Sequence, residues 1–198
     1  NRAILVDPGV NDTIRFDEIN VEFAKSFGIL HLTSFICKNG LDSFESQKKL
    51  ASEFDVVSFD PGMVYVERGL KELESILRNT TIFLPNKKEI EMLFEMDFQS
   101  AAEECISIGM EVVAIKLGSK GCYIKTPNRE VFVKSHMVEV VDTTGAGDAF
   151  NAGFLYGFFK KKDVEECGRL GNIIAAHCIQ KIGARAGLPK VEDLNKII

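Results

Sequence analysis

The sequence has neither a long apolar segment nor an excess of positive charge. No apolar run approaches the roughly 20 residues that a membrane-spanning helix requires, and no secretory signal opens the chain. The net charge is −5, and the basic cluster Lys160–Lys162 is typical of the solvated end of a helix. Because phosphate-backbone recognition usually needs a basic face, we expect neither a nucleic acid nor a membrane as partner.

The cysteines and histidines lack the spacing of a metal or disulfide framework. No CxxC pair is present, so we predict buried, reduced thiols in a cytoplasmic protein. The histidines are isolated, and we predict packed or surface positions for them rather than metal-binding or catalytic roles. The residues concerned are Cys37, Cys105, Cys122, Cys167, Cys178, His31, His136 and His177.

Short apolar or β-branched segments alternate with amphipathic helical segments along the first half of the chain. The predicted strands are residues 3–6, 29–32, 56–59 and 81–84, and the predicted helices are about 17–27, 41–53, 66–77 and 87–94. This alternation predicts a parallel sheet with helices on both faces and right-handed crossovers. The predicted fold class is therefore α/β, a three-layer α/β/α sandwich with a mostly parallel, Rossmann-like sheet.

The pattern changes after a further predicted helix at about 99–108. The elements predicted next are closely spaced strands at 112–116, 121–125 and 131–134, and helices at about 147–160, 164–180 and 191–198. No internal repeat or interdomain linker is evident, so we predict a single domain over residues 1–198. Because Asn1 leads at once into an apparent strand, we expect the chain to begin inside a fold.

The most informative segment is Asp142-Thr-Thr-Gly-Ala-Gly-Asp-Ala-Phe150. Gly145 and Gly147 allow the backbone to turn tightly and to approach a ligand closely. The helix that begins there offers unpaired N–H groups and a positive dipole end, which suit phosphate oxygens. Taken alone, the segment also fits a structural role, in which Asp148 complements the helix dipole and Asp142 caps a turn.

Residue for residue, this segment resembles the C-terminal signature of the ribokinase or PfkB carbohydrate kinase family. In that family the Gly-Ala-Gly amides form an anion hole, and the following Asp removes a proton from the substrate hydroxyl. The resemblance implies that Gly145, Ala146 and Gly147 form the anion hole and that Asp148 is the catalytic base. Fixed amides and one carboxylate suit phosphoryl transfer, which needs an oriented nucleophile and stabilised charge.

Other motifs extend the resemblance over essentially the whole chain. Asn86 and Glu89 match the family's Asn-x-x-Glu motif, which helps to organise the phosphates and Mg²⁺, with Glu89 acting indirectly on the metal. The same pair also fits a helix N-cap and its capping-box partner. Asn172 lies in a small-residue helix where relatives place an Asn beside the nucleotide base.

The segment Lys116–Gly121 resembles the family's nucleotide-contacting strand and turn. Taken alone, it also reads as a plain hairpin turn. The residues expected to contact the nucleotide are Lys116, Gly118, Ser119 and Gly121.

The segment Gly183–Pro189 resembles a family loop that lies near a monovalent cation. Ribokinases hold this cation with an Asp before the anion hole and with backbone carbonyls, so the resemblance implies a potassium site. The matching positions are Asp142, Thr144, Cys178, Lys181 and Gly183. The chain departs from the family pattern at Gly187, where ribokinases typically have a Ser hydroxyl, so activation by K⁺ stays an open point.

Family members carry a substrate-binding Asp, a Gly-Gly motif and a β-sheet lid in roughly their first hundred residues. None of these is present, so we expect a ribokinase-like fragment without its lid. Lid sheets often mediate dimerisation in this family, so a homodimer is expected only of the full-length protein. Relatives specific for sugars often place a Glu where this chain has Thr33 and Ser34, which leaves ribose-like sugars, ketodeoxy sugar acids, sugar phosphates and nucleosides open as substrates.

The sequence therefore predicts an enzyme that transfers the γ-phosphoryl group of ATP, with Mg²⁺, to a hydroxyl of a sugar or related carbohydrate. A nucleoside kinase of the same family and a non-catalytic nucleotide-binding module are the alternatives. A dinucleotide-dependent oxidoreductase does not fit, because no G-x-G-x-x-G follows a first strand with an acidic residue about 20 positions later.

Overall fold

The computed structural model describes residues 6–36, 42–190 and 192. The chain divides into two compact units, Asn1–Glu111 and Val112–Ile198, and the single domain expected from the sequence stays a prediction. The predicted end segments 3–6 and 191–198 lie outside the described residues, apart from Val6 and Glu192. Within the described part of the chain, no helix has the length and apolar character needed to cross a membrane.

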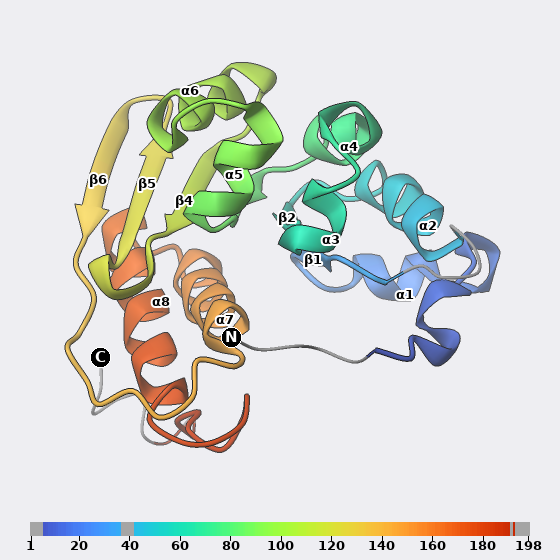
Figure 1. Cartoon of the computed structure of the whole chain (residues 1–198). Coiled ribbons are helices and arrows are strands. Elements are labelled where there is room, and N and C mark those ends of the chain that lie inside the picture. The colour runs from blue at the N-terminus through green and yellow to red at the C-terminus, as the bar shows by residue number, and fades with distance from the viewer. Residues whose placement is uncertain (1–5, 37–41, 191, 193–198) are drawn as a thin grey trace. The chain divides into compact units, whose positions relative to one another are not determined.

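The first unit contains a parallel three-stranded sheet with β2 at its centre (Figure 1). Its strands are β1 (Leu30–Thr33), β2 (Val57–Asp60) and β3 (Ile82–Phe83). Its helices are α1 (Val21–Lys25), α2 (Asp42–Ala51), α3 (Gly62–Val66), α4 (Leu70–Leu77), α5 (Lys87–Phe94) and α6 (Phe98–Ile108). The parallel pairing and the alternation of strands and helices confirm the prediction for the first half of the chain.

Aromatic side chains form the centre of the core in this unit. Phe59 of β2 stacks on Phe83 of β3 with a ring-centroid distance of 5.8 Å. Tyr65 of α3 lies beside Phe59 and meets the ring edge of Phe44 from α2 at 4.9 Å. All four rings are fully buried, and such pairs contribute about 0.5–1.5 kcal/mol each beyond the burial of their area. The core thus ties α2 and α3 to the middle of the parallel sheet.

Two predicted helices are shorter than expected. The helix predicted over 66–77 is interrupted at Gly69, which has a φ of +85° and separates α3 from α4. A right-handed helix cannot continue through a residue in the left-handed region. The helix predicted over 17–27 consists of a 3-10 turn at Phe16–Glu18 and the short α1, which starts where the Asn20 side chain accepts the N–H of Phe23.

The second unit combines an antiparallel meander with two long helices. Its elements are β4 (Val112–Lys116), β5 (Cys122–Thr126), β6 (Arg129–Val133), α7 (Ala146–Phe159) and α8 (Val164–Cys178). Strand β5 pairs with both of its neighbours, which confirms the closely spaced strands. Helices α7 and α8 lie side by side, and α8 packs on β5 and β6 (Figure 1).

Glycines allow α7 and α8 to approach each other closely. A Cβ atom on Gly153 would lie 2.7 Å from the carbonyl oxygen of Leu170. On the facing helix, a Cβ atom on Gly171 would lie 2.8 Å from the ring of Phe150. Real Cβ atoms do not come this close to other heavy atoms, so a larger residue at either glycine would force the helices apart.

The described cysteines are buried and free, as predicted, and Cys37 lies outside the described residues. Burial raises the pKa of the Cys122 thiol to about 12 and that of Cys167 to about 11. Both side chains are therefore neutral thiols at physiological pH, which is the expected behaviour of packed structural cysteines.

Candidate functional site

The glycine-rich segment forms the start of α7. Gly145 is the N-cap residue with a φ of +80°, and the helix begins at Ala146. The amide of Ala146 donates to the carbonyl of Thr143 at 3.2 Å. The amides of Gly147 and Asp148 lie in the first turn, where no intrahelical carbonyl is available to them. A ligand anion at this helix start would meet backbone N–H groups and the positive end of the dipole.

Gly145 packs against the loop that follows α8. A Cβ atom on Gly145 would lie 2.6 Å from the Cβ of Ala184 and 2.9 Å from its Cα. A left-handed φ and the absence of a side chain are therefore both required at this position. Sequence reasoning missed Ala184, because nothing near it in the chain indicates a contact about forty residues away.

Asp142 ties the two loops together. One oxygen of its carboxylate accepts the N–H of Thr144 at 2.9 Å, and the other accepts the N–H of Gly183 at 2.9 Å. The backbone N–H groups of Val141 and Asp142 both donate to the carbonyl of Ile179, just after α8. The structural role expected of Asp142 is thus present, and it fixes the position of the chain immediately before the anion-hole residues.

Asp148 presents an exposed carboxylate at the first turn of α7. Among the described residues, no side chain or backbone group forms a hydrogen bond or ion pair with this carboxylate. Burial raises the pKa of the Cys178 thiol, and the negative charges of Asp148 and Asp142 raise this pKa further. The position and exposure of Asp148 allow it to meet a ligand in front of the helix.

Four of the five positions predicted for a monovalent cation come together at this end of α8. The Asp142 carboxylate accepts a hydrogen bond from the N–H of Gly183. The thiol of Cys178 lies 3.6 Å from the carbonyl oxygen of Thr144 and 3.4 Å from that of Ala184. Lys181 is exposed, and no contact of the described chain joins it to this group. These residues offer one carboxylate and several backbone oxygens, a donor set typical of hard cations.

Steric crowding explains why position 187 is a glycine. A Cβ atom there would lie 2.4 Å from the carbonyl oxygen of His177 and 2.6 Å from that of Cys178. The Ser found in ribokinases could not occupy this backbone conformation without a shift of the loop. The replacement of the family's Ser by Gly187 therefore follows from the close packing of this loop on the end of α8.

The predicted nucleotide-contacting turn is the 3-10 turn Gly118–Lys120 between β4 and β5. Gly121 follows with a φ of +95°, and a Cβ atom there would lie 2.0 Å from the carbonyl oxygen of Val133. The Oγ of Ser135 donates to the carbonyl of Ser119 at 2.5 Å. The hairpin expected from the sequence is confirmed, and its tip is held against the chain that leaves β6.

Asn172 also binds the backbone at the end of β6. It is buried on α8, and its Nδ2 donates to the carbonyls of Val133 at 3.1 Å and Lys134 at 3.3 Å. Sequence reasoning missed this structural role. The position beside a nucleotide base stays a prediction, and Asn172 already holds the backbone against which the Gly118–Gly121 turn packs.

Asn86 and Glu89 lie in the first unit and form a capping box at the start of α5. The Asn86 side chain accepts the N–H of Glu89 at 3.0 Å, and the Glu89 carboxylate accepts the N–H of Asn86 at 2.8 Å. Glu89 is buried despite its charge, which agrees with a carboxylate held by a backbone donor. The structural role predicted for this pair is confirmed, and its role toward phosphates and Mg²⁺ stays a prediction.

We expect Asn86→Ala to lower the free energy of unfolding by about 1 kcal/mol, because one N-terminal amide of α5 loses its acceptor. Chemical denaturation measures this change. Asp97→Ala is the matched control, since Asp97 caps α6 in the same way through Gln99 and Ser100. If Asn86 has no second role, both variants keep the nucleotide affinity of the parent; a loss confined to Asn86→Ala supports the phosphate role.

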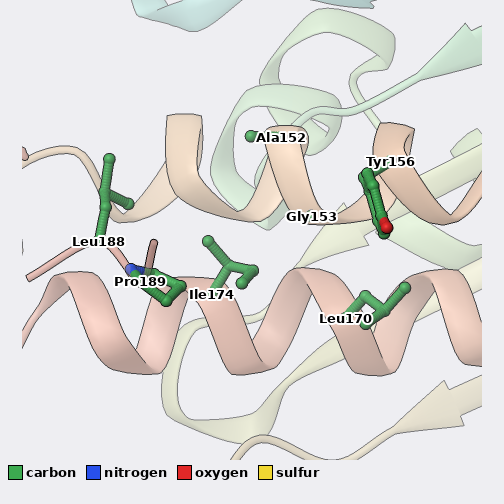
Figure 2. Close-up of a pocket in the computed structure, with 7 residues that line it drawn as sticks. All are labelled: Ala152, Gly153, Tyr156, Leu170, Ile174, Leu188 and Pro189. Atoms are coloured by element: carbon green, nitrogen blue, oxygen red, sulfur yellow. The ribbon is translucent and has the colours of Figure 1, made fainter. Parts of the chain in front are cut away.

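An apolar cavity of about 240 Å³ is lined by α7, α8 and the segment that follows α8 (Figure 2). Tyr156 of α7, Leu170 and Ile174 of α8, and Leu188 and Pro189 contribute its walls. None of the predicted site residues lines it. Phosphate recognition needs polar donors, so this cavity is not the predicted nucleotide site.

No three His, Cys, Asp or Glu side chains of the described residues are grouped closely enough to hold a metal ion. His31, which we predicted to be packed or on the surface, is exposed on β1 with its Nδ1 3.1 Å from the Oγ of Ser58. A divalent ion could still be held by one or two carboxylates together with the phosphates of a ligand and water, as Mg²⁺ usually is.

Comparison with known proteins agrees with these features. Residues 1–191 match the sequence profile of the pfkB family carbohydrate kinases. An uncharacterized sugar kinase of Archaeoglobus fulgidus is 68% identical over 98% of this chain and 77% of its own length. An ATP-dependent ribose-1-phosphate kinase of Halopiger xanaduensis is 31% identical over 93% of the chain and 59% of its own length.

The crystal structure of a ribokinase from Thermotoga maritima has a TM-score of 0.85 and 28% identity. The match covers 98% of this chain and 64% of that protein. The ribokinase-like α/β fold predicted from the sequence is therefore confirmed. The chain spans less than two thirds of the length of two of these three relatives.

Proposed function

Because the chain belongs to the pfkB family of carbohydrate kinases, we propose that the protein transfers the γ-phosphoryl group of ATP to a hydroxyl group of a sugar or a related compound. The names of two relatives support this proposal: one is called a sugar kinase and the other an ATP-dependent ribose-1-phosphate kinase. The observation that carries it is the exposed carboxylate of Asp148 in the first turn of a glycine-started helix.

In this proposal Asp148 is the general base. An acceptor hydroxyl in front of α7 donates its hydrogen bond to the Asp148 carboxylate and transfers its proton there as the oxygen attacks the γ-phosphorus. The bond between that phosphorus and the bridging oxygen breaks, and ADP is the leaving group. No other described group bonds to that carboxylate, so it need not exchange an existing partner. A positioned base of this kind typically contributes about 10²- to 10⁴-fold to the rate.

The backbone amides at the helix start stabilise the charge on the transferred group. Gly145, Ala146 and Gly147 are the residues assigned to this anion hole. The amide of Ala146 must exchange its 3.2 Å bond to Thr143 for the phosphoryl oxygen. Fixed amides need no reorganisation during the reaction, which is the reason that such donors are effective.

The nucleotide itself is assigned to Lys116, Gly118, Ser119, Gly121 and Asn172 of the second unit. Asn86 and Glu89 of the first unit are assigned to the phosphates and, indirectly, to Mg²⁺. When bound with the nucleotide, Mg²⁺ supplies positive charge that neutralises the phosphate oxygens.

A monovalent cation is assigned to the loops joined by Asp142. The carboxylate of Asp142 and the backbone carbonyls of Thr144, Cys178, Lys181 and Gly183 would hold it. The oxygen-rich donor set fits K⁺, and the ion would add positive charge close to the anion hole.

The test is a panel of acceptors assayed with the complete protein, ATP and Mg²⁺, with and without K⁺. The panel contains ribose, a ketodeoxy sugar acid, ribose 1-phosphate and nucleosides, and phosphorylated product is measured. We expect one acceptor class to be phosphorylated at a rate that depends on its concentration. Binding of ATP without any acceptor-dependent product would refute the enzyme and favour a nucleotide-binding module.

A further inference from the structure

The side chain of Cys178, the last residue of α8, contacts two loops near the start of α7. Its Sγ lies 3.6 Å from the carbonyl oxygen of Thr144 and 3.4 Å from that of Ala184. The side chain is fully buried, and all three residues belong to the second compact unit. A carbonyl oxygen can only accept a hydrogen bond, so the thiol is the donor in both contacts.

Both carbonyl groups belong to residues next to Gly145, the N-cap residue of α7. Thr144 directly precedes Gly145 in the chain. Ala184 packs against it, because a Cβ atom on Gly145 would lie 2.6 Å from the Cβ of Ala184. A displacement of either residue therefore moves the backbone from which the anion hole is built. The Cys178 thiol thus connects the two segments that fix the position of Gly145.

Cys178 also lies in the core next to the proposed base. The buried side chains of Ala149, Ile174 and Cys178 form one cluster, and Ala149 directly follows Asp148. Protein interiors are close-packed, so a change in one member of such a cluster is felt by the others. Residues 145–148 are therefore held at one end by the Thr144 carbonyl and at the other by Ala149, and Cys178 takes part in both arrangements.

The thiol keeps its proton under physiological conditions, as a hydrogen-bond donor must. Burial and the negative charges of Asp148 and Asp142 raise its pKa. Even an unperturbed thiol, with a pKa of about 8.5, is mainly protonated at pH 7. The contacts to the two carbonyl oxygens are therefore present throughout the pH range in which a kinase of this kind would work.

We propose that Cys178 is a positioning residue whose thiol holds the anion hole and Asp148 in place for phosphoryl transfer. This inference rests on the proposed function and deepens it. Cys178 is buried, so it acts through Thr144 and Ala184 rather than on the substrate. Catalysis by fixed amides and an oriented carboxylate is sensitive to small displacements, and an error of about 1 Å can cost 10²-fold in rate.

The first test compares Cys178→Ala with Cys178→Ser. Alanine removes the hydrogen-bond donor, whereas serine keeps a hydroxyl donor at nearly the same volume. In the complete protein we expect kcat to fall about 10- to 100-fold in Cys178→Ala and to recover at least partly in Cys178→Ser. Calorimetric titration should show a much smaller loss of ATP affinity. A parent kcat in Cys178→Ala, or equal losses in both variants, would overturn the proposal.

Cys167→Ala and Cys167→Ser are the matched controls. Cys167 is also fully buried on α8, and its Sγ lies 3.6 Å from the carbonyl oxygen of Lys162. Lys162 follows the other end of α7, so these changes should lower the melting temperature to a similar extent and keep the parent kcat. A loss of kcat in Cys167→Ala as large as that in Cys178→Ala would show a general effect of stability and contradict the positioning role.

Hydrogen–deuterium exchange tests the positioning without turnover. The N–H groups of Val141 and Asp142 donate to Ile179, and that of Thr144 donates to Asp142. Exchange over residues 141–149 should therefore rise in Cys178→Ala, rise less in Cys178→Ser and stay at the parent level in the Cys167 variants. Unchanged exchange in Cys178→Ala would refute the positioning role.

Thermal denaturation checks that each variant folds. If Cys178→Ala does not fold, Cys178→Val takes its place, because valine also lacks a donor but fills the site. The two proposals can fail separately. A protein that phosphorylates no acceptor refutes the proposed function, while the exchange measurement still decides whether Cys178 holds the start of α7.

Discussion

Replacement of Asp148 by Asn should lower kcat by about 10²- to 10⁴-fold, the contribution typical of a positioned general base. The amide side chain has nearly the same shape, so α7 and its first-turn amides should be preserved. Because Asn cannot take up the proton of an acceptor hydroxyl, the loss should appear in kcat. The affinity for ATP should change little. Product formation and calorimetric titration with ATP measure the two effects.

Asp163→Asn is the control for this substitution. Asp163 is the N-cap of α8, where its side chain accepts the N–H of Glu165. Like Asp148 it is an acidic residue at a helix start, so changes in helix electrostatics should be similar. Turnover in Asp163→Asn should match that of the parent. Near-parent turnover in Asp148→Asn would remove Asp148 from the mechanism.

Gly145→Ala should lower both the stability of the protein and its affinity for ATP. Its φ of +80° is unfavourable for alanine, and the new Cβ would lie 2.6 Å from the Cβ of Ala184. Backbone strain of this kind costs about 1–3 kcal/mol, and the steric overlap adds to it. Relief of the overlap requires the loop after α8 to move away from the anion hole. Denaturation and ATP titration measure the two consequences.

Gly109→Ala separates the backbone strain from the steric overlap. Gly109, which follows α6, has a φ of +118° and a left-handed helical backbone like that of Gly145, but no atom lies within 4 Å of its Cβ position. Gly109→Ala should therefore show the cost of the backbone alone and leave ATP affinity unchanged. If both variants lose the same stability and both keep ATP affinity, contact with Ala184 has no part in the site.

Local contacts could be predicted from the sequence because they depend on few residues. Asn86 and Glu89 form the expected capping box, since both lie within one turn of α5. The helix predicted over 87–94 has the bounds of α5 for the same reason. By contrast, Gly69 was placed inside a continuous helix, because a sequence does not reveal which glycine adopts a left-handed conformation.

Contacts between distant segments could not be predicted. The Nζ of Lys116 donates a hydrogen bond to Oδ1 of Asn151, which is 35 residues away, and Asn172 is 39 residues from Val133. Both contacts depend on how α7 and α8 are set against the meander, which no local pattern encodes. The sequence identified Lys116 and Asn172 through family resemblance but gave no indication of their partners Asn151 and Val133. The fold class and the motif residues could be predicted from the sequence, whereas the long-range hydrogen bonds that hold these residues in place could not.

The glycine contact between α7 and α8 also determines the register of the proposed phosphate-binding amides. A helix behaves as a screw, because a slide of one residue moves it by about 1.5 Å and turns it by about 100°. Gly153 against Leu170 and Gly171 against Phe150 prevent both motions. A misplacement of about 1 Å far from the reacting atoms can cost 10²-fold in rate. The accuracy of the helix start is thus set two turns along α7, at Gly153, which is not one of the residues assigned to the nucleotide or to the acceptor.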